Sequence, residues 1–179
     1  MAESFVNSVT RAVGVVTSSS ACSVGVQTNL ITGITTTNVT VGDIVQNTNY
    51  IAGTKVSSIG VNSTTCDRDS TNTTAATSQT VKYLGLTTAY TSASGTKSII
   101  IGGTFANNTP NEVELTLHLY DNSASATPAI ISRVPVPNGS SFVLSDTGKT
   151  VLEGLDAIRV YCDTANGVDV QLGILKGVS

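Results

Sequence analysis

The stretch Val-Glu-Leu-Thr-Leu-His-Leu-Tyr at residues 113–120 decides the fold class. Its valine and three leucines alternate with more polar side chains, so in an extended chain the apolar groups share one face. Residues 168–174, Val-Asp-Val-Gln-Leu-Gly-Ile, repeat the alternation. Both segments predict half-buried β-strands, and the short apolar run Ser98–Ile101 predicts a fully buried one.

Turn-forming residues separate such strands at regular intervals in the second half of the chain. Asn-Asn-Thr-Pro-Asn at 107–111, a Ser/Ala-rich stretch at 121–128 and Asn-Gly pairs at 138–139 and 166–167 suit tight turns. Roughly seven strands at 8–12-residue spacing are typical of a sandwich or jelly roll. The sequence therefore predicts an all-β fold, with an antiparallel β-sandwich or jelly-roll-like domain over residues 86–179.

Residues 25–85 predict a second, smaller β module. This region is rich in Thr and Gly, and its apolar runs are short. Residues 67–78 are polar and low in complexity, which predicts a long exposed loop or hairpin. Short strands are expected at 29–34, 43–45, 55–60 and 79–83.

Residues 1–24 are expected to form an N-terminal anchoring arm, helical or extended. Phe5, Val6, Val9 and Val13 fall at helical spacing, with Ser4 as a helix N-cap. Because so short a helix is marginal alone, these four apolar residues are the candidate interface. They either dock on the chain's own sandwich or insert, as a swapped arm, into a neighbouring subunit or another protein. As an arm, residues 1–13 should be removable without unfolding the sandwich.

The composition argues against chemistry at an active site. The 179 residues include nine Lys and Arg, twelve Asp and Glu, one His and no Trp, and the formal net charge is -3. Enzymes need convergent ionisable groups, and nucleic-acid binders need clustered cations, whereas here the cations are scattered. We therefore expect no enzyme, no cofactor, no metal and no nucleic-acid partner. No signal peptide or membrane span is expected either.

The polar residues that resemble catalytic or metal sites each have a structural interpretation. His118 is expected on the exposed face of its strand, where Glu112 and Glu114 are either solvated or paired with basic residues across an interface. Asp67 and Asp69 have the spacing of a calcium loop but lack its glycine and distal glutamate, which favours a solvated loop. The nearby carboxylates Glu153 and Asp156 are expected to cap a turn.

The three cysteines are far apart and have no metal-binding spacing. Cys162 shares a strand face with Ile158 and Val160, which predicts a buried, inert thiol. For Cys22 and Cys66 a disulfide is the alternative to two buried thiols.

The chain resembles small virion structural proteins of tailed bacteriophages, of the marine-phage and cyanophage type. Residues 31–34, 41–45 and 51–59 resemble a "TGI…VGD.V…I..GT.V..I" module that recurs in phage structural proteins. The other matching segments cover the N-terminus and the predicted sandwich, namely 4–9, 13–14, 134–141, 151–160 and 168–170.

This resemblance implies a non-enzymatic capsid decoration or cement protein, made in the bacterial host cytoplasm and located in the virion. Its implied partners are further copies of itself and the major capsid protein. A neck, collar or tail-fibre component, bound to neck or tail proteins, is the alternative. A host- or glycan-binding module is a further alternative, and such sites use exposed aromatic rings. The candidate rings are Tyr50, Tyr83, Tyr90, Tyr120 and Tyr161.

Overall fold

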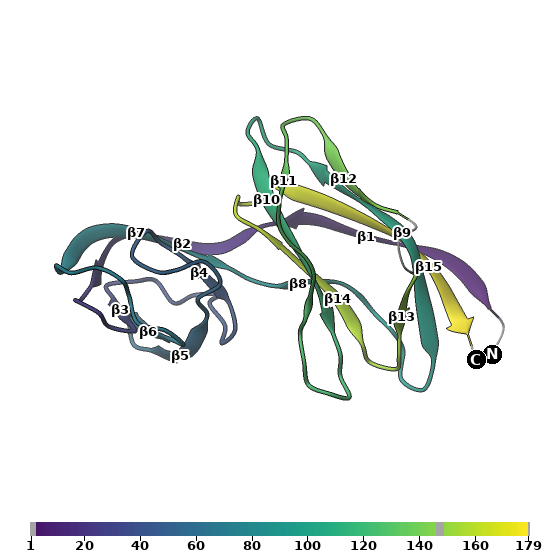
Figure 1. Cartoon of the computed structure of the whole chain (residues 1–179), viewed down its shortest axis with the longest axis horizontal. Coiled ribbons are helices and arrows are strands. Elements are labelled where there is room, and N and C mark those ends of the chain that lie inside the picture. The colour runs from purple at the N-terminus through teal and green to yellow at the C-terminus, as the bar shows by residue number, and fades with distance from the viewer. Residues whose placement is uncertain (1–2, 146–148, 179) are drawn as a thin grey trace. The chain divides into compact units, whose positions relative to one another are not determined.

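The computed structural model describes residues 3–145 and 149–178, and these residues form two compact units. The larger unit combines the N-terminal strand with residues 86–178, and the smaller one spans Val15–Gly85. Fifteen strands and no helix are found in the described residues, so the all-β prediction is confirmed (Figure 1).

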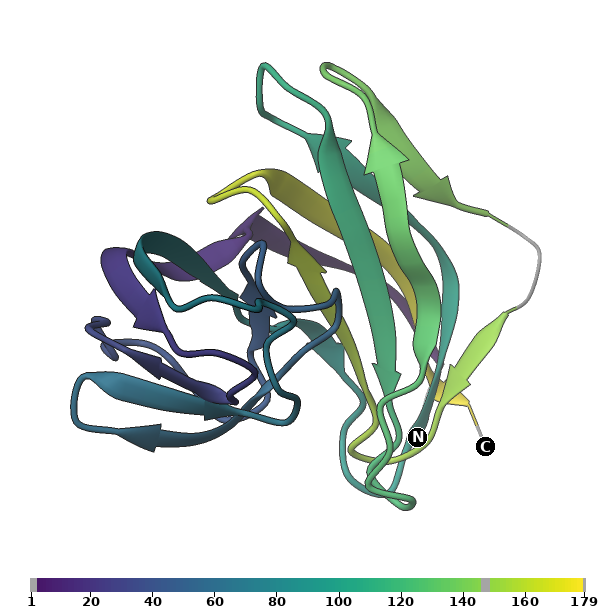
Figure 2. The ribbon, with the colours of Figure 1, turned by 60° about the vertical axis from the view of Figure 1, so that its left-hand side comes forward.

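The larger unit is a sandwich of two antiparallel sheets (Figure 2). In the five-stranded sheet, β1 (Ser4–Val13) pairs with β15 (Val168–Val178), β15 with β9 (Lys97–Asn107), and β9 with both β12 (Ser141–Leu144) and β13 (Thr150–Leu152). The four-stranded sheet has the order β11 (Ala129–Val136), β10 (Val113–Tyr120), β14 (Ala157–Cys162) and β8 (Thr87–Thr91).

The strand pairs nest around one central hairpin. β10 pairs with β11, β9 with β12 and β13, β8 with β14, and β1 with β15. Rolling such a long antiparallel hairpin over itself gives the two-sheet jelly roll. The jelly-roll-like prediction is therefore confirmed, and the first and last strands of the chain lie side by side.

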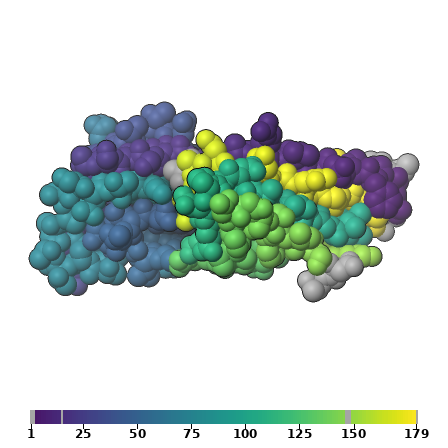
Figure 3. Space-filling view, turned by 90° about the horizontal axis from the view of Figure 1, so that it is seen from above, coloured from purple at the N-terminus to yellow at the C-terminus, as the bar shows by residue number. Residues whose placement is uncertain are grey.

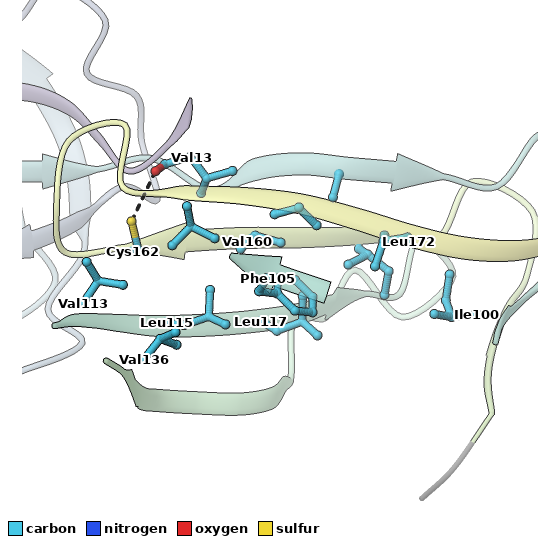
Figure 4. Close-up of a cluster of buried hydrophobic side chains, with 14 of the residues drawn as sticks. Val13, Ile100, Phe105, Val113, Leu115, Leu117, Val136, Val160, Cys162 and Leu172 are labelled. Atoms are coloured by element: carbon cyan, nitrogen blue, oxygen red, sulfur yellow. Dashed lines mark hydrogen bonds between the residues drawn. The ribbon is translucent and has the colours of Figure 1, made fainter. Parts of the chain in front are cut away.

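The core of the larger unit comes from the alternation seen in the sequence (Figure 4). Val113, Leu115 and Leu117 of β10 are fully buried, and β10 has the bounds that the sequence predicts. The prediction of a fully buried strand at Ser98–Ile101 is wrong. Ile100 is buried but Ile101 is exposed, because β9 has only one face against the core.

The N-terminal segment is extended rather than helical. Residues 4–13 form β1, which pairs with β15 from Ser4 to Val13 with a register shift after Thr10. The helical alternative is therefore wrong. The four-residue spacing of Phe5, Val9 and Val13 fits both a helix and a strand, so it could not distinguish the two in the sequence. Of the residues expected as an arm, 1–24, the strand β1 belongs to the larger unit and β2 (Val15–Val24) to the smaller one.

The smaller unit is a closed barrel inserted between β1 and β8. Its strand order is β4 (Ile44–Gln46), β7 (Ala76–Leu84), β2, β3 (Leu30–Thr32), β6 (Ser63–Cys66) and β5 (Val56–Gly60). The amide of Val45 donates to the carbonyl of Thr54 at 2.8 Å, and that of Val56 to Asp43 at 2.9 Å, which joins β4 to the start of β5. This closure satisfies backbone groups that an open sheet would leave at its edges.

The barrel interior contains hydrogen-bonded polar groups among its apolar side chains. The hydroxyls of Tyr83 and Thr64, both fully buried, lie 2.8 Å apart. Ser70 is also buried, and its hydroxyl oxygen accepts a hydrogen bond from the amide of Thr28 at 3.0 Å. The expectation of an exposed loop over 67–78 is therefore wrong at Ser70, and β7 already begins at Ala76.

Candidate interaction surface

The outer face of the five-stranded sheet carries exposed apolar side chains. Since Val6, Phe142, Leu144 and Leu152 of the same strands point into the core, their neighbours point away from it. These neighbours are large and strongly exposed: Phe5 (77%), Val9 (66%), Val143 (56%), Val151 (50%) and the bulge residue Ile101 (40%). We call these five residues the apolar face.

A continuous row of apolar side chains crosses the sheet. Phe5 is the register partner of Leu175, Leu175 of Ile99, and Ile99 of Val151. Directly opposed residues in neighbouring strands lie about 5 Å apart, so these four side chains are neighbours along the row. Four strands thus contribute to one ridge of apolar groups.

A second row runs parallel to the first. Val9 is the partner of Gln171, Gln171 of Thr104, and Thr104 of Val143. Between the rows, Asn7 opposes Gly173, which opposes Gly102, so this part of the face lacks large side chains. The result is a groove of about 420 Å³ whose lining includes Phe5, Ile101 and Gln171.

Charged groups flank the two rows and are absent from them. Nε of Arg11 lies 3.6 Å from the carboxylate of Asp169 at one end of the sheet. That carboxylate also accepts the amide of Ala12 at 2.9 Å, and this hydrogen bond, more than the nearby guanidinium, lowers the pKa of Asp169. The rows themselves are uncharged, which keeps the desolvation cost of covering them small.

The four candidate interface residues divide between the surface and the core. Phe5 and Val9 point outward from β1, whereas Val6 packs against the core and Val13 is 1% exposed. Sequence reasoning missed Ile101, Val143 and Val151. The alternation around Leu152 could have placed Val151, but Phe142, Val143 and Leu144 are apolar on both faces, and their sequence does not tell inside from outside.

The outer face of the four-stranded sheet is polar, and its groups contact one another. Arg133 binds Glu114 through two hydrogen bonds of 2.9 Å, so Glu114 is paired within the chain rather than solvated or paired across an interface. The ring of His118 stacks on Tyr161 with centroids 5.7 Å apart, and its Nδ1 lies 3.1 Å from the carbonyl of Thr127. This side chain is half-buried rather than exposed.

Two of the five tyrosines lie on an outer sheet face, with another side chain against each ring. Tyr50 and Tyr83 are buried in the barrel, and the hydroxyl of Tyr90 lies 2.9 Å from that of Ser98. Tyr120 and Tyr161 lie on the polar outer face. Their rings are covered by Arg159, 3.8 Å from the Tyr120 centroid, and by His118.

The remaining sequence candidates have structural roles. Asp67 accepts the amide of Lys55 at 2.8 Å. Asp156 accepts the amides of Glu153 and Asn122, each at 2.9 Å, so it caps a turn as expected. Among the described residues, no group of three or more His, Cys, Asp or Glu side chains could hold a metal ion. Within the same residues, no helix has the length and apolar character needed to cross a membrane.

The cysteines are free thiols, and all three are buried. The Cys22–Cys66 disulfide considered from the sequence is not formed, and the prediction of a buried Cys162 is confirmed. Burial raises the pKa of Cys22 and Cys162, and raises that of Cys66 to about 11. Such thiols are poor nucleophiles at neutral pH.

Comparison of the chain with protein-family models, with curated proteins and with solved structures finds no match. The geometry of the two sheets is therefore the basis for the functional proposal.

Proposed function

We propose that this chain is a non-enzymatic structural protein of a tailed-bacteriophage particle. The preferred role is a capsid decoration or cement protein that assembles as a homo-oligomer and contacts the major capsid protein. The observation that carries the proposal is the apolar face, which occupies one side of a rigid jelly roll. Exposed apolar surface of this kind marks a protein contact.

The mechanism is binding through burial. Covering the row from Phe5 to Val151 removes apolar surface from water at about 25 cal/mol per Å². Because the face is built on paired strands, its backbone is already ordered before a partner covers it. The sequence resemblance to virion proteins supports the phage setting, and jelly rolls are frequent in viral capsid domains.

The test is the copy number of this chain in purified particles of the phage whose genome encodes it. Quantitative mass spectrometry against the major capsid protein gives that number. Hundreds of copies per particle would support a shell decoration protein, whereas about a dozen would place the chain at the neck, collar or tail fibre. Absence from mature particles would contradict the proposal.

A host- or glycan-binding role is the second candidate, and Tyr120 and Tyr161 favour it. These rings lie on one sheet face beside Arg159 and His118, which are side chains that bind sugar hydroxyls. A glycan array with the intact protein tests this role. Binding that is lost in Tyr120→Ala and Tyr161→Ala variants would support it, and an array without signal would contradict it.

A further inference from the structure

The four sheet edges of the jelly roll differ in how well they are protected against pairing. β11 contains Pro135, and its register against β10 shifts twice. The backbone of Arg133 in this strand has a positive φ of 52°, which is not a strand conformation. β8 has five residues and a register shift, and the opposite edge of the five-stranded sheet is divided into β12 and β13, of four and three residues. Prolines, bulges and short strands are the usual protection of edges.

β1 has little of this protection. It is a strand of ten residues at the end of its sheet, and it pairs regularly with β15 from Ser4 to Thr10. It contains no proline, and its one charged residue, Arg11, lies beyond the regular part. In the space-filling view β1 (dark purple) runs along the surface beside β15 (yellow) (Figure 3). A long, regular and partly apolar edge is a template for another strand.

The sequence of β1 is complementary to itself about Asn7. In an antiparallel pair with Asn7 on a two-fold axis, residues equally far before and after Asn7 lie opposite each other. On the outward face this sets Phe5 against Val9 of the second copy and Glu3 against Arg11 of the second copy. Apolar groups meet apolar groups and opposite charges meet, twice each by symmetry.

Neighbouring registers lack this match. An axis on Ser8 sets Phe5 against Arg11, and an axis on Val6 sets Glu3 against Val9. Arg11 can reach Glu3 of a second copy because its side chain is 83% exposed and its contact with Asp169, at 3.6 Å, leaves guanidinium donors available.

We infer that β1 pairs with β1 of a second copy of this chain, antiparallel and with Asn7 on the two-fold axis. This inference rests on the proposed homo-oligomeric function and specifies the contact between copies. The two five-stranded sheets become continuous, and the row beginning at Phe5 meets the row beginning at Val9 of the second copy. The dimer therefore presents an apolar face of doubled width to the particle.

Cysteine cross-linking of the full chain tests the pairing directly. In Asn7→Cys the two new thiols lie opposite each other at about 5 Å between Cα atoms, within disulfide range. In Phe5→Cys, the matched control on the same strand face, they are about 13 Å apart along the strands. Mild oxidation should give a covalent dimer only for Asn7→Cys. The native cysteines are buried and do not compete.

A charge exchange tests the register independently. Sedimentation should show a dimer of the wild-type chain, and Glu3→Arg should weaken it about tenfold, because both symmetric ion pairs become repulsive. The double variant with Arg11→Glu should recover the dimer. Glu112→Arg, an exposed carboxylate before β10, should leave it unchanged.

A monomeric wild-type chain, or equal cross-linking of both cysteine variants, would overturn the inference. If either result is found and the chain is nevertheless abundant in virions, the β1 pairing is contradicted but the proposed structural function is still supported. A dimer that is absent from virions would contradict the function and retain the pairing.

Discussion

The thiol of Cys162 donates a hydrogen bond to the carbonyl oxygen of Val13, with 3.2 Å between sulfur and oxygen (Figure 4). The contact joins the end of β1 to the end of β14. Val13 is itself buried in the same core. The N-terminal strand is therefore an integral part of the jelly roll, not an arm lying against it.

This relationship argues against the expectation that residues 1–13 can be removed without unfolding the sandwich. Val13→Ala removes two buried methyl groups and should lower the free energy of unfolding by about 2 kcal/mol. Phe5→Ala, on the outward face of the same strand, should change it by less than about 0.5 kcal/mol. Urea unfolding followed by circular dichroism measures both. Equal and small effects would show that β1 contributes no packing to the core.

The alkaline stability of the barrel should depend on Cys66. Burial raises the pKa of this thiol from 9.0 to about 11, so the unfolded chain loses the proton first. The stabilisation is complete below pH 9 and is lost as the pH rises towards about 11. Tyr83, whose pKa is raised to about 12, adds to the loss from pH 10 upward.

The Cys66→Ala variant isolates this effect. It should be less stable than wild type at pH 7, because a cavity forms, yet its stability should fall less between pH 9 and 11. Thermal unfolding across this range measures the difference. All other titrating groups are the same in both proteins, so a difference between the pH profiles of wild type and variant reports on Cys66. Parallel pH profiles would mean that the thiol is not what titrates.

The sequence predicted the jelly roll well where one face of a strand is apolar and the other polar. β10 shows this: Val113, Leu115 and Leu117 define the core, and turn residues define the strand ends. β2 was missed, since its Ser, Thr, Ala and Cys residues give little contrast between faces. Burial in β2 depends on the barrel around it, which local sequence does not encode.

The apolar face was harder to predict than the core. Phe5 and Val9 could be identified as interface candidates, but Val6 and Val13 were grouped with them. Adjacent residues such as Phe5 and Val6 share a helix face but point to opposite faces of a strand, and the register shift after Thr10 turns Val13 inward. Val143 and Val151 come from short strands far along the chain. Only their shared partner β9 brings them beside Ile101.

The barrel should be removable without unfolding the jelly roll. Its first and last strands, β2 and β7, are paired, with Val15 opposite Leu84, so the insertion begins and ends at one place. Replacing residues 15–85 with a short Gly/Ser linker should therefore let β1 and β8 keep their partners. Circular dichroism and a cooperative thermal transition would verify this. A variant that lacks such a transition would show that the jelly roll depends on the barrel.

The apolar face should be required for incorporation into particles and dispensable for folding. Val143→Asp with Val151→Asp places two carboxylates on this face, away from β1, at side chains that are 56% and 50% exposed. Burying unpaired charges against a partner is strongly unfavourable, so incorporation should fall at least tenfold. The unfolding free energy should change by less than about 0.5 kcal/mol per site. Val61→Asp, at a 91% exposed barrel residue, is the matched control. Mass spectrometry of particles assembled with each variant measures incorporation. Equal amounts of the face variant and the control would show that the particle contact lies on another surface.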